Sequence, residues 1–341
     1  MNLTELNQLK PYLDGLLADG LVPALSLCVV RHDDTWIYHG GVKDLDTQEP
    51  NRRDTLFDLA SLTKVIATTS SILQLRDEGY LRLQDPLCRY LPGCTVNATI
   101  KECLLHATGC QAGKIDYRYM NEQQLREAVL HHPQVAELIG QPVYSDVNFI
   151  LLGWVVEQAS PYHSLRRHVE ARILQPLHMR DTGYCPADTE RCCAYEKTAD
   201  DGTIRGRVHD GKAFRLGGVC GHAGLFSTVD DIALFLHAFL REDPVLLQPE
   251  TFRELYEPHI STPQRVRTYG WILRDVDRPV PKRASGRTLF HTGFTGNYLY
   301  IDKERDTGIG VLSNRIHPDR RNRRIIEQLQ DIYDHIDACL E

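Results

Sequence analysis

Several common signatures are missing from this sequence. No apolar run is long enough to cross a membrane as a helix, and the first residues lack the basic start and apolar stretch of a signal peptide. Acidic residues outnumber basic ones by 46 to 39, giving a net charge of −7. This charge argues against a general nucleic-acid binder and against a polybasic membrane patch. We therefore expect neither nucleic acid nor membrane as a partner.

The ten cysteines follow neither a metal-binding nor a secreted pattern. No Cys-x-x-Cys pair is present, the close pair is Cys192-Cys193, and the other spacings are irregular. Cys28, Cys103 and Cys220 lie in apolar stretches, where they fit as small buried hydrophobic residues. These features favour a reducing cytoplasm.

What is present is the composition of an ordinary globular protein: 341 residues, 42% hydrophobic and 25% charged. The length allows one large domain or two. Helical periodicity dominates the middle of the chain, and amphipathic helices are expected at residues 3–17 and 320–338. Alternating strand patterns lie near both ends, at residues 24–30, 35–39, 269–273, 297–301 and 308–313.

This distribution predicts an α+β fold in which the two termini build one sheet. Residues 1–60 and 262–341 would form the sheet domain, flanked by the N- and C-terminal helices. Residues 61–261 would form a mainly helical domain inserted into it. The basic run at residues 320–324 is interpreted as the solvated face at the start of the last helix.

One short motif stands out at the start of a helical stretch. Ser61 and Lys64 lie three residues apart, between a mainly apolar segment and the apolar-periodic residues 65–75. Residues at this spacing share one helix face, so the ammonium can lie against the hydroxyl, and a helix N-terminus favours developing negative charge. Such a pair can activate a serine without a histidine. The alternative is a solvated helix surface, and partners elsewhere in the chain decide between the two.

Two later stretches supply such partners. Tyr-Ser-Asp at residues 144–146 enters a very apolar segment, and His-Thr-Gly at residues 291–293 precedes an apolar hairpin. In this order the three motifs resemble those of the penicillin-recognising serine hydrolases, whose general set is Ser-x-x-Lys, Ser-Asp-Asn and Lys-Thr-Gly. The resemblance is to the branch of class C β-lactamases, DD-peptidases and related esterases. It runs from residue 57 to residue 315 and includes the glycine-rich residues 221–227.

The resemblance implies a role for each of the reactive groups. Ser61 would be the nucleophile that forms an acyl-enzyme, with Lys64 holding positive charge beside it. Tyr144 would be the base, because a close ammonium is expected to lower the tyrosine pKa from its ordinary ~10. Lys64 itself remains the rival base. The backbone amides of Ser61 and Phe294 would form the oxyanion hole.

The third motif would line the substrate side of the cleft. The resemblance implies that His291 and Thr292 contact the substrate or the leaving group. Gly293 would let this edge strand approach the substrate closely. His291 alone would also fit a satisfied strand histidine, and its position before Thr-Gly favours the cleft.

The second motif departs from the family pattern at Asp146, where asparagine is usual. An amide can donate a hydrogen bond to a substrate carbonyl, whereas an ionised carboxylate can only accept. We expect Asp146 to pair with Lys64, which keeps the lysine charged and favours Tyr144 as the base. Asp146 can also serve as the N-cap of the helix that follows. The change weakens the expected grip on an acylamino side chain, and with it the expectation of efficient β-lactam hydrolysis.

His209, Asp210 and His222 are further candidates for lining the cleft. His209 and Asp210 lie in a segment that resembles one in peptidoglycan-associated members, and His222 lies in the glycine-rich stretch. They can border the cleft or hold loops by hydrogen bonds. No pair of possible ligands has helix spacing, so no metal is expected.

Together, the resemblance implies a β-lactamase/transpeptidase-like α+β fold, with an antiparallel sheet, an inserted all-helical domain and the active site in the cleft between them. It implies a serine hydrolase that cleaves an ester or amide through an acyl-Ser61 intermediate, without a cofactor. Small esters and D-amino-acid or muropeptide-like peptides are the candidate small-molecule substrates. The alternative, favoured by Asp146, is a non-catalytic, penicillin-binding-like ligand-binding or regulatory protein. The oligomeric state stays open.

Overall fold

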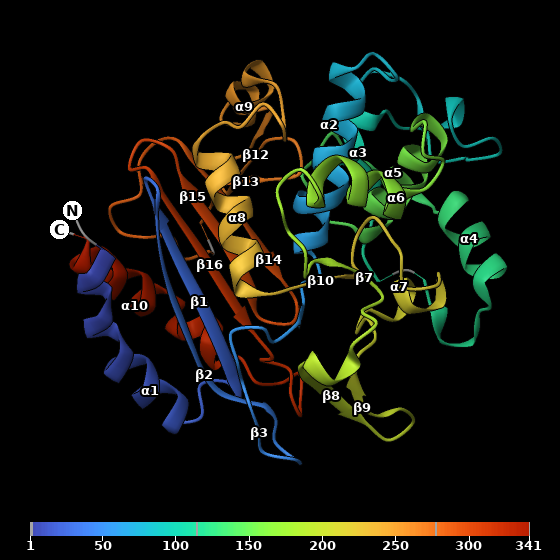
Figure 1. Cartoon of the computed structure of the whole chain (residues 1–341). Helices are drawn as coiled ribbons and strands as arrows, with labels where there is room; N and C mark the ends of the chain where they lie inside the picture. The colour runs from blue at the N-terminus through green and yellow to red at the C-terminus, as the bar shows by residue number, and fades with distance from the viewer. Residues whose placement is uncertain (1–2, 114, 277, 341) are drawn as a thin grey trace.

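An antiparallel sheet of nine strands forms one half of the molecule (Figure 1). The computed structural model describes residues 3–113, 115–276 and 278–340. The strands are β1 Ala24–Arg31, β2 Asp34–Asp44, β3 Glu49–Pro50, β11 Ile260–Ser261, β12 Arg265–Arg267, β13 Ile272–Asp275, β14 Thr288–Gly293, β15 Asn297–Asp302 and β16 Thr307–Ser313. They run in the order β11-β12-β13-β14-β15-β16-β1-β2-β3, so the first strand pairs with the last.

Helices cover both faces of this sheet, which explains why β1 is buried almost throughout. Alternate side chains point to opposite faces: Leu27 and Val29 pack with the terminal helices, and Cys28 and Val30 pack toward α8. Figure 1 shows the two terminal helices together on one side of the sheet and α8 on the other. These helices are η1 Leu3–Leu9, α1 Lys10–Ala18, α8 Val229–Leu240 and α10 Arg324–Cys339.

The middle of the chain is mainly helical and is built around one buried helix, α5, against which α2, α3, α4 and α6 pack. The helices are η2 Lys64–Thr69, α2 Ser70–Asp77, η3 Leu87–Arg89, α3 Ile100–Leu104, η4 Tyr117–Tyr119, α4 Glu122–Leu130, α5 Asp146–Ala159, α6 Leu165–Val169, η5 Glu170–Leu174, η6 Thr189–Arg191, α7 Gly211–Arg215 and α9 Pro249–Leu255. Short strands accompany them: β4 Phe57–Asp58, β5 Thr108–Cys110, β6 Gln134–Ile139, β7 Gly183–Tyr184, β8 Ala194–Thr198, β9 Gly202–Arg205 and β10 Leu225–Ser227.

The expected α+β fold, with one antiparallel sheet built from both ends of the chain, is confirmed. The domain boundaries at 60/61 and 261/262 stay a prediction, and α8, which lies between them in sequence, packs on the sheet. Among the helices of the described residues, none combines the length and the apolar character that a membrane crossing demands.

The expected start of the last helix is wrong. The helix begins at Arg324, and the four residues before it form a turn at residues 320–321 and an irregular segment. Asp319 accepts a hydrogen bond from the N–H of Arg321 at 2.9 Å, and Asn322 accepts one from the N–H of Arg324 at 3.0 Å. These side-chain bonds compete with helical backbone bonds and hold the turn.

Candidate active site

The backbone just before Ser61 has an unusual conformation. Ala60 has a φ of 46°, in the left-handed region that residues with a Cβ rarely adopt. The Asp58 carboxylate accepts a hydrogen bond from the Ala60 N–H at 2.8 Å, and the Asp58 carbonyl accepts from the side chains of Thr295 and Asn297, both at 2.8 Å. These bonds hold a strained turn, so that Ser61 lies between β4 and the first helical turn, beside the segment that follows β14.

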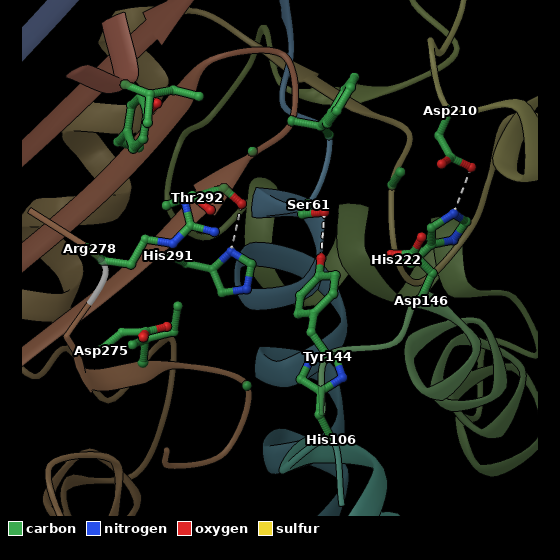
Figure 2. Close-up of a pocket in the computed structure, with 18 of the residues that line it drawn as sticks. Ser61, His106, Tyr144, Asp146, Asp210, His222, Asp275, Arg278, His291 and Thr292 are labelled. Carbon is green, nitrogen blue, oxygen red and sulfur yellow. Dashed lines mark hydrogen bonds and ion pairs between the residues drawn. The ribbon is translucent and has the colours of Figure 1, made fainter. Parts of the chain in front are cut away.

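Ser61, Lys64 and Tyr144 meet at one hydroxyl group. Lys64 Nζ donates to Ser61 Oγ at 2.9 Å, and the Tyr144 hydroxyl donates to the same oxygen at 2.7 Å. Figure 2 shows Tyr144 pointing its hydroxyl at Ser61. The lysine ammonium also lies 4.9 Å from the centre of the tyrosine ring. The fold therefore brings together the three side chains predicted to be catalytic, and their roles stay a prediction.

Asp146 lies between two lysines at the first residue of α5. Its Oδ1 accepts from Lys64 Nζ at 2.9 Å, and its Oδ2 lies 3.1 Å from Lys212 Nζ. Lys64 also donates to the His222 carbonyl at 3.0 Å, so all three N–H groups of its ammonium have acceptors. The N-cap interpretation of Asp146 is wrong, because Ser145 is the N-cap and the Asp146 carboxylate faces the lysines.

These contacts determine the charges in the site. Burial acts to lower the pKa of Lys64, but Asp146 and Tyr144 outweigh it and the pKa lies above its ordinary value. Burial acts to raise the pKa of Asp146, but Lys64, His222 and Lys212 hold it well below its ordinary range. Both partners of the pair are therefore ionised, and a lysine held charged is a poor base.

The expected lowering of the Tyr144 pKa is wrong for the resting site. Although 41% of the residue's surface is exposed, burial raises its pKa despite the opposing effect of Lys64. The ring packs on His106, with 4.6 Å between ring centroids. The phenol is thus neutral in the free protein, and it donates its proton to a hydrogen bond with Ser61.

His291 and Thr292 lie at the end of β14, across the cavity from Asp146 (Figure 2). Burial and then Lys64 hold the pKa of His291 well below its ordinary value. Its Nδ1 lies 3.1 Å from the Thr292 carbonyl, to which it donates. The imidazole is therefore neutral, and Nε2 is left as a hydrogen-bond acceptor.

Gly293 is required by the backbone of the nucleophile segment. A Cβ built at this position would lie 2.6 Å from the Leu59 carbonyl oxygen. Gly293 therefore lets the end of β14 lie against the chain just before Ser61. The close approach to the substrate predicted for this glycine stays a prediction.

Two backbone N–H groups beside the Ser61 hydroxyl are available to a ligand. Over the described part of the chain, no residue accepts a hydrogen bond from the N–H of Ser61 or of Phe294, and both residues line the cavity. The Phe294 ring stacks on His209, with 5.8 Å between centroids. Free N–H groups are what an oxyanion hole needs, so these two remain its candidates.

His209, Asp210 and His222 also line the cavity, and hydrogen bonds hold each in place. His222 Nε2 lies 2.8 Å from Asp210 Oδ1, and His209 Nε2 lies 3.0 Å from Glu196 Oε2. Burial acts to lower the pKa of His222, but Cys220 and Asp210 outweigh it and raise the pKa to about 9. His222 is therefore cationic near neutral pH.

Asp146, Asp210 and His222 do not fit a metal ion. Their ligand atoms lie within 4.8 Å of one another, which is close enough to share one. However, Lys212 Nζ lies 3.1 Å from Asp146 and 3.7 Å from Asp210, so an ammonium already supplies the positive charge.

Sequence reasoning misses Lys212 and a set of arginines. Lys212 follows Asp210 by two residues, and only the fold brings it to Asp146. The cavity has a volume of about 980 Å³, and its lining among the described residues includes Arg265, Arg267, Arg278, Arg315, Arg320, Arg321 and Arg323. For three of these arginines, the signal in the sequence is the basic run at residues 320–324. Its interpretation as a solvated helix face is wrong, since three of its arginines line the cavity.

Known proteins share sequence and fold with this chain. The family model described as Beta-lactamase matches residues 9–332. The chain is 30% identical to "Putative D-alanyl-D-alanine carboxypeptidase" of Escherichia coli (strain K12), over 93% of this chain and 83% of that protein. Among solved structures, EstCE1, a hydrolase with promiscuous acyltransferase activity, aligns with a TM-score of 0.79 at 20% identity, over 96% of this chain and 98% of that one. A class C β-lactamase aligns with a TM-score of 0.78 at 18% identity, over 99% and 96%.

The chain therefore belongs to the β-lactamase family. It is an enzyme of the β-lactamase-like serine hydrolase class with the β-lactamase/transpeptidase-like fold, so the predicted resemblance and fold are confirmed.

Proposed function

We propose that this protein cleaves an ester or amide in a small-molecule substrate through an acyl-Ser61 intermediate. The observation that carries the proposal is the convergence of Lys64 Nζ and the Tyr144 hydroxyl on Ser61 Oγ, at 2.9 and 2.7 Å. D-alanyl peptides are one candidate substrate class, because a relative that spans most of the chain has a D-alanyl-D-alanine carboxypeptidase name. Small esters are the other, because EstCE1 shares the fold.

The protons in the resting site indicate how Ser61 is activated. Asp146 holds Lys64 charged, and Tyr144 is neutral, so this coupled pair has to lose one proton before it acts as a base. The phenolate of Tyr144, stabilised by the adjacent ammonium, then takes the Ser61 proton as Oγ attacks the carbonyl carbon. The resulting phenol protonates the leaving nitrogen or oxygen as its bond to carbon breaks.

The backbone would stabilise the negative charge that develops on the substrate oxygen. The N–H groups of Ser61 and Phe294 have no acceptor among the described residues and supply that function. In the second half of the reaction, Tyr144 takes a proton from the water that attacks the acyl carbon. It returns a proton to Ser61 Oγ when the ester bond to the enzyme breaks. Neither half calls for a cofactor.

Acylation of Ser61 tests the proposal directly. A fluorescent penicillin or p-nitrophenyl acetate is expected to add an acyl group to Ser61 that mass spectrometry detects, and Ser61→Ala is expected to abolish the labelling. A folded sample that reacts with neither probe would contradict the proposal. Rates on D-alanyl dipeptides and on short acyl esters then separate a peptidase from an esterase.

The alternative, a non-catalytic, penicillin-binding-like protein that binds a ligand or regulates, conflicts with the enzyme class of the chain. The resting charges alone would fit it, because Lys64 is fully hydrogen-bonded as an ammonium and Tyr144 is neutral. A folded sample in which Ser61 reacts with no acylating probe, while a ligand still binds, would select this function.

We also propose a cytoplasmic location. All ten cysteines are free thiols in the structure, which fits a reducing compartment. The proposal would fail if fractionation of the native host recovered the protein outside the cytoplasm.

A further inference from the structure

Lys212 is a largely buried lysine that touches the active site from outside the cavity. Its Nζ lies 3.1 Å from Asp146 Oδ2 and 3.7 Å from Asp210 Oδ2, and only 16% of its side chain is exposed. The ammonium also lies 5.5 Å from the centre of the Tyr117 ring. Asp146, Asp210 and Tyr117 line the cavity, whereas Lys212 is absent from the lining that the described residues form. Lys212 therefore acts on residues of the site and is not placed to contact a substrate.

Two sets of contacts fix the position of Lys212. Asp210 is the N-cap of α7, and its Oδ1 accepts hydrogen bonds from the N–H groups of Lys212 and of the next residue, both at 2.9 Å. The same oxygen lies 2.8 Å from His222 Nε2. Figure 2 shows Asp210, His222 and Asp146 on the same side of Tyr144. The capping bonds place the lysine backbone, and the two carboxylates direct its ammonium toward this side of the site.

Asp146 is the counter-ion of both lysines. Its Oδ1 accepts from Lys64 Nζ at 2.9 Å, and its Oδ2 faces Lys212. Burial acts to lower the pKa of Lys212, but Asp210 and Asp146 outweigh it and raise the pKa, so Lys212 is cationic. A positive charge beside one carboxylate oxygen weakens the negative field that reaches the other side of the carboxylate. Lys212 therefore reduces the hold of Asp146 on the Lys64 proton.

That hold matters because the proposed mechanism needs one proton to leave the Lys64–Tyr144 pair. Burial acts to lower the pKa of Lys64 and to raise that of Tyr144, and Asp146 acts to raise both. The carboxylate acting alone would move the loss of this proton to a higher pH. With Lys212 in place, much of the carboxylate charge is cancelled.

Charged or titratable groups on other segments also lie near the pair. They are His106 after α3, Asp210 before α7, His222 before β10, Arg267 on β12 and His291 on β14. His106 and His291 are neutral, because burial and then Lys64 hold the pKa of each well below its ordinary value. Arg267 has a carboxylate of its own, on an aspartate of β13 at 2.9 Å. The groups around Asp146 therefore decide the charge beside the pair.

Of His222 and Lys212, the lysine is the one that keeps its charge at alkaline pH. Burial acts to raise the pKa of Asp146, and three cations outweigh it: Lys64, His222 and Lys212. His222 has a pKa of about 9, raised against burial by Cys220 and Asp210, so its charge is lost as pH passes that value. Lys212 is therefore the lasting counter-charge in the pH range where the pair has to become basic.

We propose that Lys212 is a positioning residue that lets the Lys64–Tyr144 pair become basic at a lower pH. It does so by offsetting the charge of Asp146, and this inference rests on the proposed function. The released proton passes to water, and the phenolate remains beside the Lys64 ammonium. Together, Asp146 and Lys212 supply the electrostatic balance that the neutral asparagine of the family pattern supplies alone.

The pH dependence of kcat/KM on p-nitrophenyl acetate tests this inference in four proteins: wild type, Lys212→Met, Asp146→Asn and the double variant. After subtraction of the hydroxide-catalysed rate, the midpoint of the rise toward alkaline pH is expected to lie about one pH unit higher in Lys212→Met. Its kcat/KM below the midpoint then falls about 10-fold. The midpoint is expected to lie about one pH unit lower in Asp146→Asn, and that of the double variant is expected to match the wild type.

Lys212→Arg and Lys10→Met are the matched controls. The first keeps the positive charge and is expected to keep the wild-type midpoint. Lys10 is exposed on α1 and absent from the described lining of the cavity, so its loss removes the same charge and is expected to leave the midpoint in place. A rate of Lys212→Met that falls by the same factor at every pH, with the midpoint unchanged, would overturn the inference.

If Lys212→Met does not fold, Asp146→Asn and the double variant give the same test. The two proteins both lack the carboxylate and differ only at residue 212. The midpoint is expected to lie about one pH unit higher in the double variant, and equal midpoints would overturn the inference.

Titration of Tyr144 separates this inference from the proposed function. In Ser61→Ala with tyrosine labelled with carbon-13 at Cζ, NMR follows the phenol through the resonance that Tyr144→Phe removes. The further change Lys212→Met is expected to raise the pH at which this resonance first shifts by about one unit. If no ester is hydrolysed, such a rise supports the role of Lys212 even though the hydrolase proposal has failed. An unchanged titration counts against the inference.

Discussion

The ammonium of Lys64 lies 2.9 Å from a carboxylate oxygen of Asp146 and 2.9 Å from the hydroxyl oxygen of Ser61. The lysine side chain is fully buried, and the other carboxylate oxygen of Asp146 faces Lys212 at 3.1 Å. The family pattern has a neutral asparagine where this chain has Asp146. The site therefore carries one negative charge more than that pattern, and the second lysine balances it.

Removing Asp146 is expected to destabilise the protein strongly. Asp146→Ala leaves two lysines without their shared counter-ion, and breaking a buried pair in this way costs about 3–5 kcal/mol. Urea unfolding at pH 7 measures the change. The double variant Asp146→Asn with Lys212→Met keeps an acceptor for Lys64 and restores the charge balance, so it is expected to recover most of the stability. Equal stability in the two variants would contradict the charge argument.

Tyr144→Phe is expected to lower kcat/KM by about 10²–10⁴-fold, the usual contribution of a general base. The change keeps the ring on His106 and removes the hydroxyl that contacts Ser61. Because the Lys64–Tyr144 pair has to lose a proton, the wild-type rate is expected to rise toward alkaline pH, and the variant is expected to lose that rise. Tyr119→Phe, at an 88% exposed residue, is the control. A small loss with an unchanged pH profile would identify Lys64 as the base.

Gly293→Ala is expected to reduce activity more than stability. The new Cβ would lie 2.6 Å from the Leu59 carbonyl oxygen, so β14 has to move away from the nucleophile segment. Misplacing an oxyanion-hole donor costs about 10²–10³-fold in rate, whereas overpacking costs about 1–3 kcal/mol. Gly183→Ala, whose Cβ meets no atom within 4 Å, is the matched control. Steady-state kinetics and urea unfolding on both variants check the prediction, which fails if Gly293→Ala keeps full activity.

His222 is expected to make stability depend on pH between 6.5 and 9. Burial opposes its charge, but Cys220 and Asp210 raise its pKa from 6.5 to about 9 in the folded protein. A raised pKa stabilises the fold fully below pH 6.5, and the stabilisation is lost as pH rises through 9. The loss is at most about 3 kcal/mol.

The control for this pH dependence is His222→Gln, which removes the titrating group. The difference in unfolding free energy between wild type and variant is expected to shrink as pH rises from 6 to 9.5 in urea titrations. A difference that stays constant over this range would show that His222 does not carry the shift.

Short sequence patterns predict much of the fold and the residues at the centre of the site. The alternating strands near both ends and the helical periodicity between them predict the sheet and its terminal helices, because burial imposes those periods. Ser61, Lys64, Tyr144 and His291 follow from three short motifs in a fixed order. Asp146 is predicted to pair with Lys64 because the carboxylate departs from that pattern.

The features that the sequence does not reveal depend on distant contacts or on burial. Lys212 reaches Asp146 only through the packing of α7 near α5. The pKa of Tyr144 is raised because burial outweighs the nearby ammonium, and burial of one hydroxyl cannot be judged from neighbouring residues in sequence. The turn before α10 depends on Asp319 and Asn322, and its arginines face a cavity whose other walls are far away along the chain.

The pairing of β1 with β16 fixes the order in which the molecule can be completed during synthesis. The ribosome releases Ser61 and the whole helical region long before β14–β16 emerge, so β1, paired with β2, lacks its second neighbour for most of translation. Thr295 and Asn297, which hold the carbonyl of Asp58, also arrive only in that last stretch. The strained turn before Ser61 therefore cannot reach its final geometry until the end of the chain is made. Nascent chains stalled before β14 are expected to lack acylation activity.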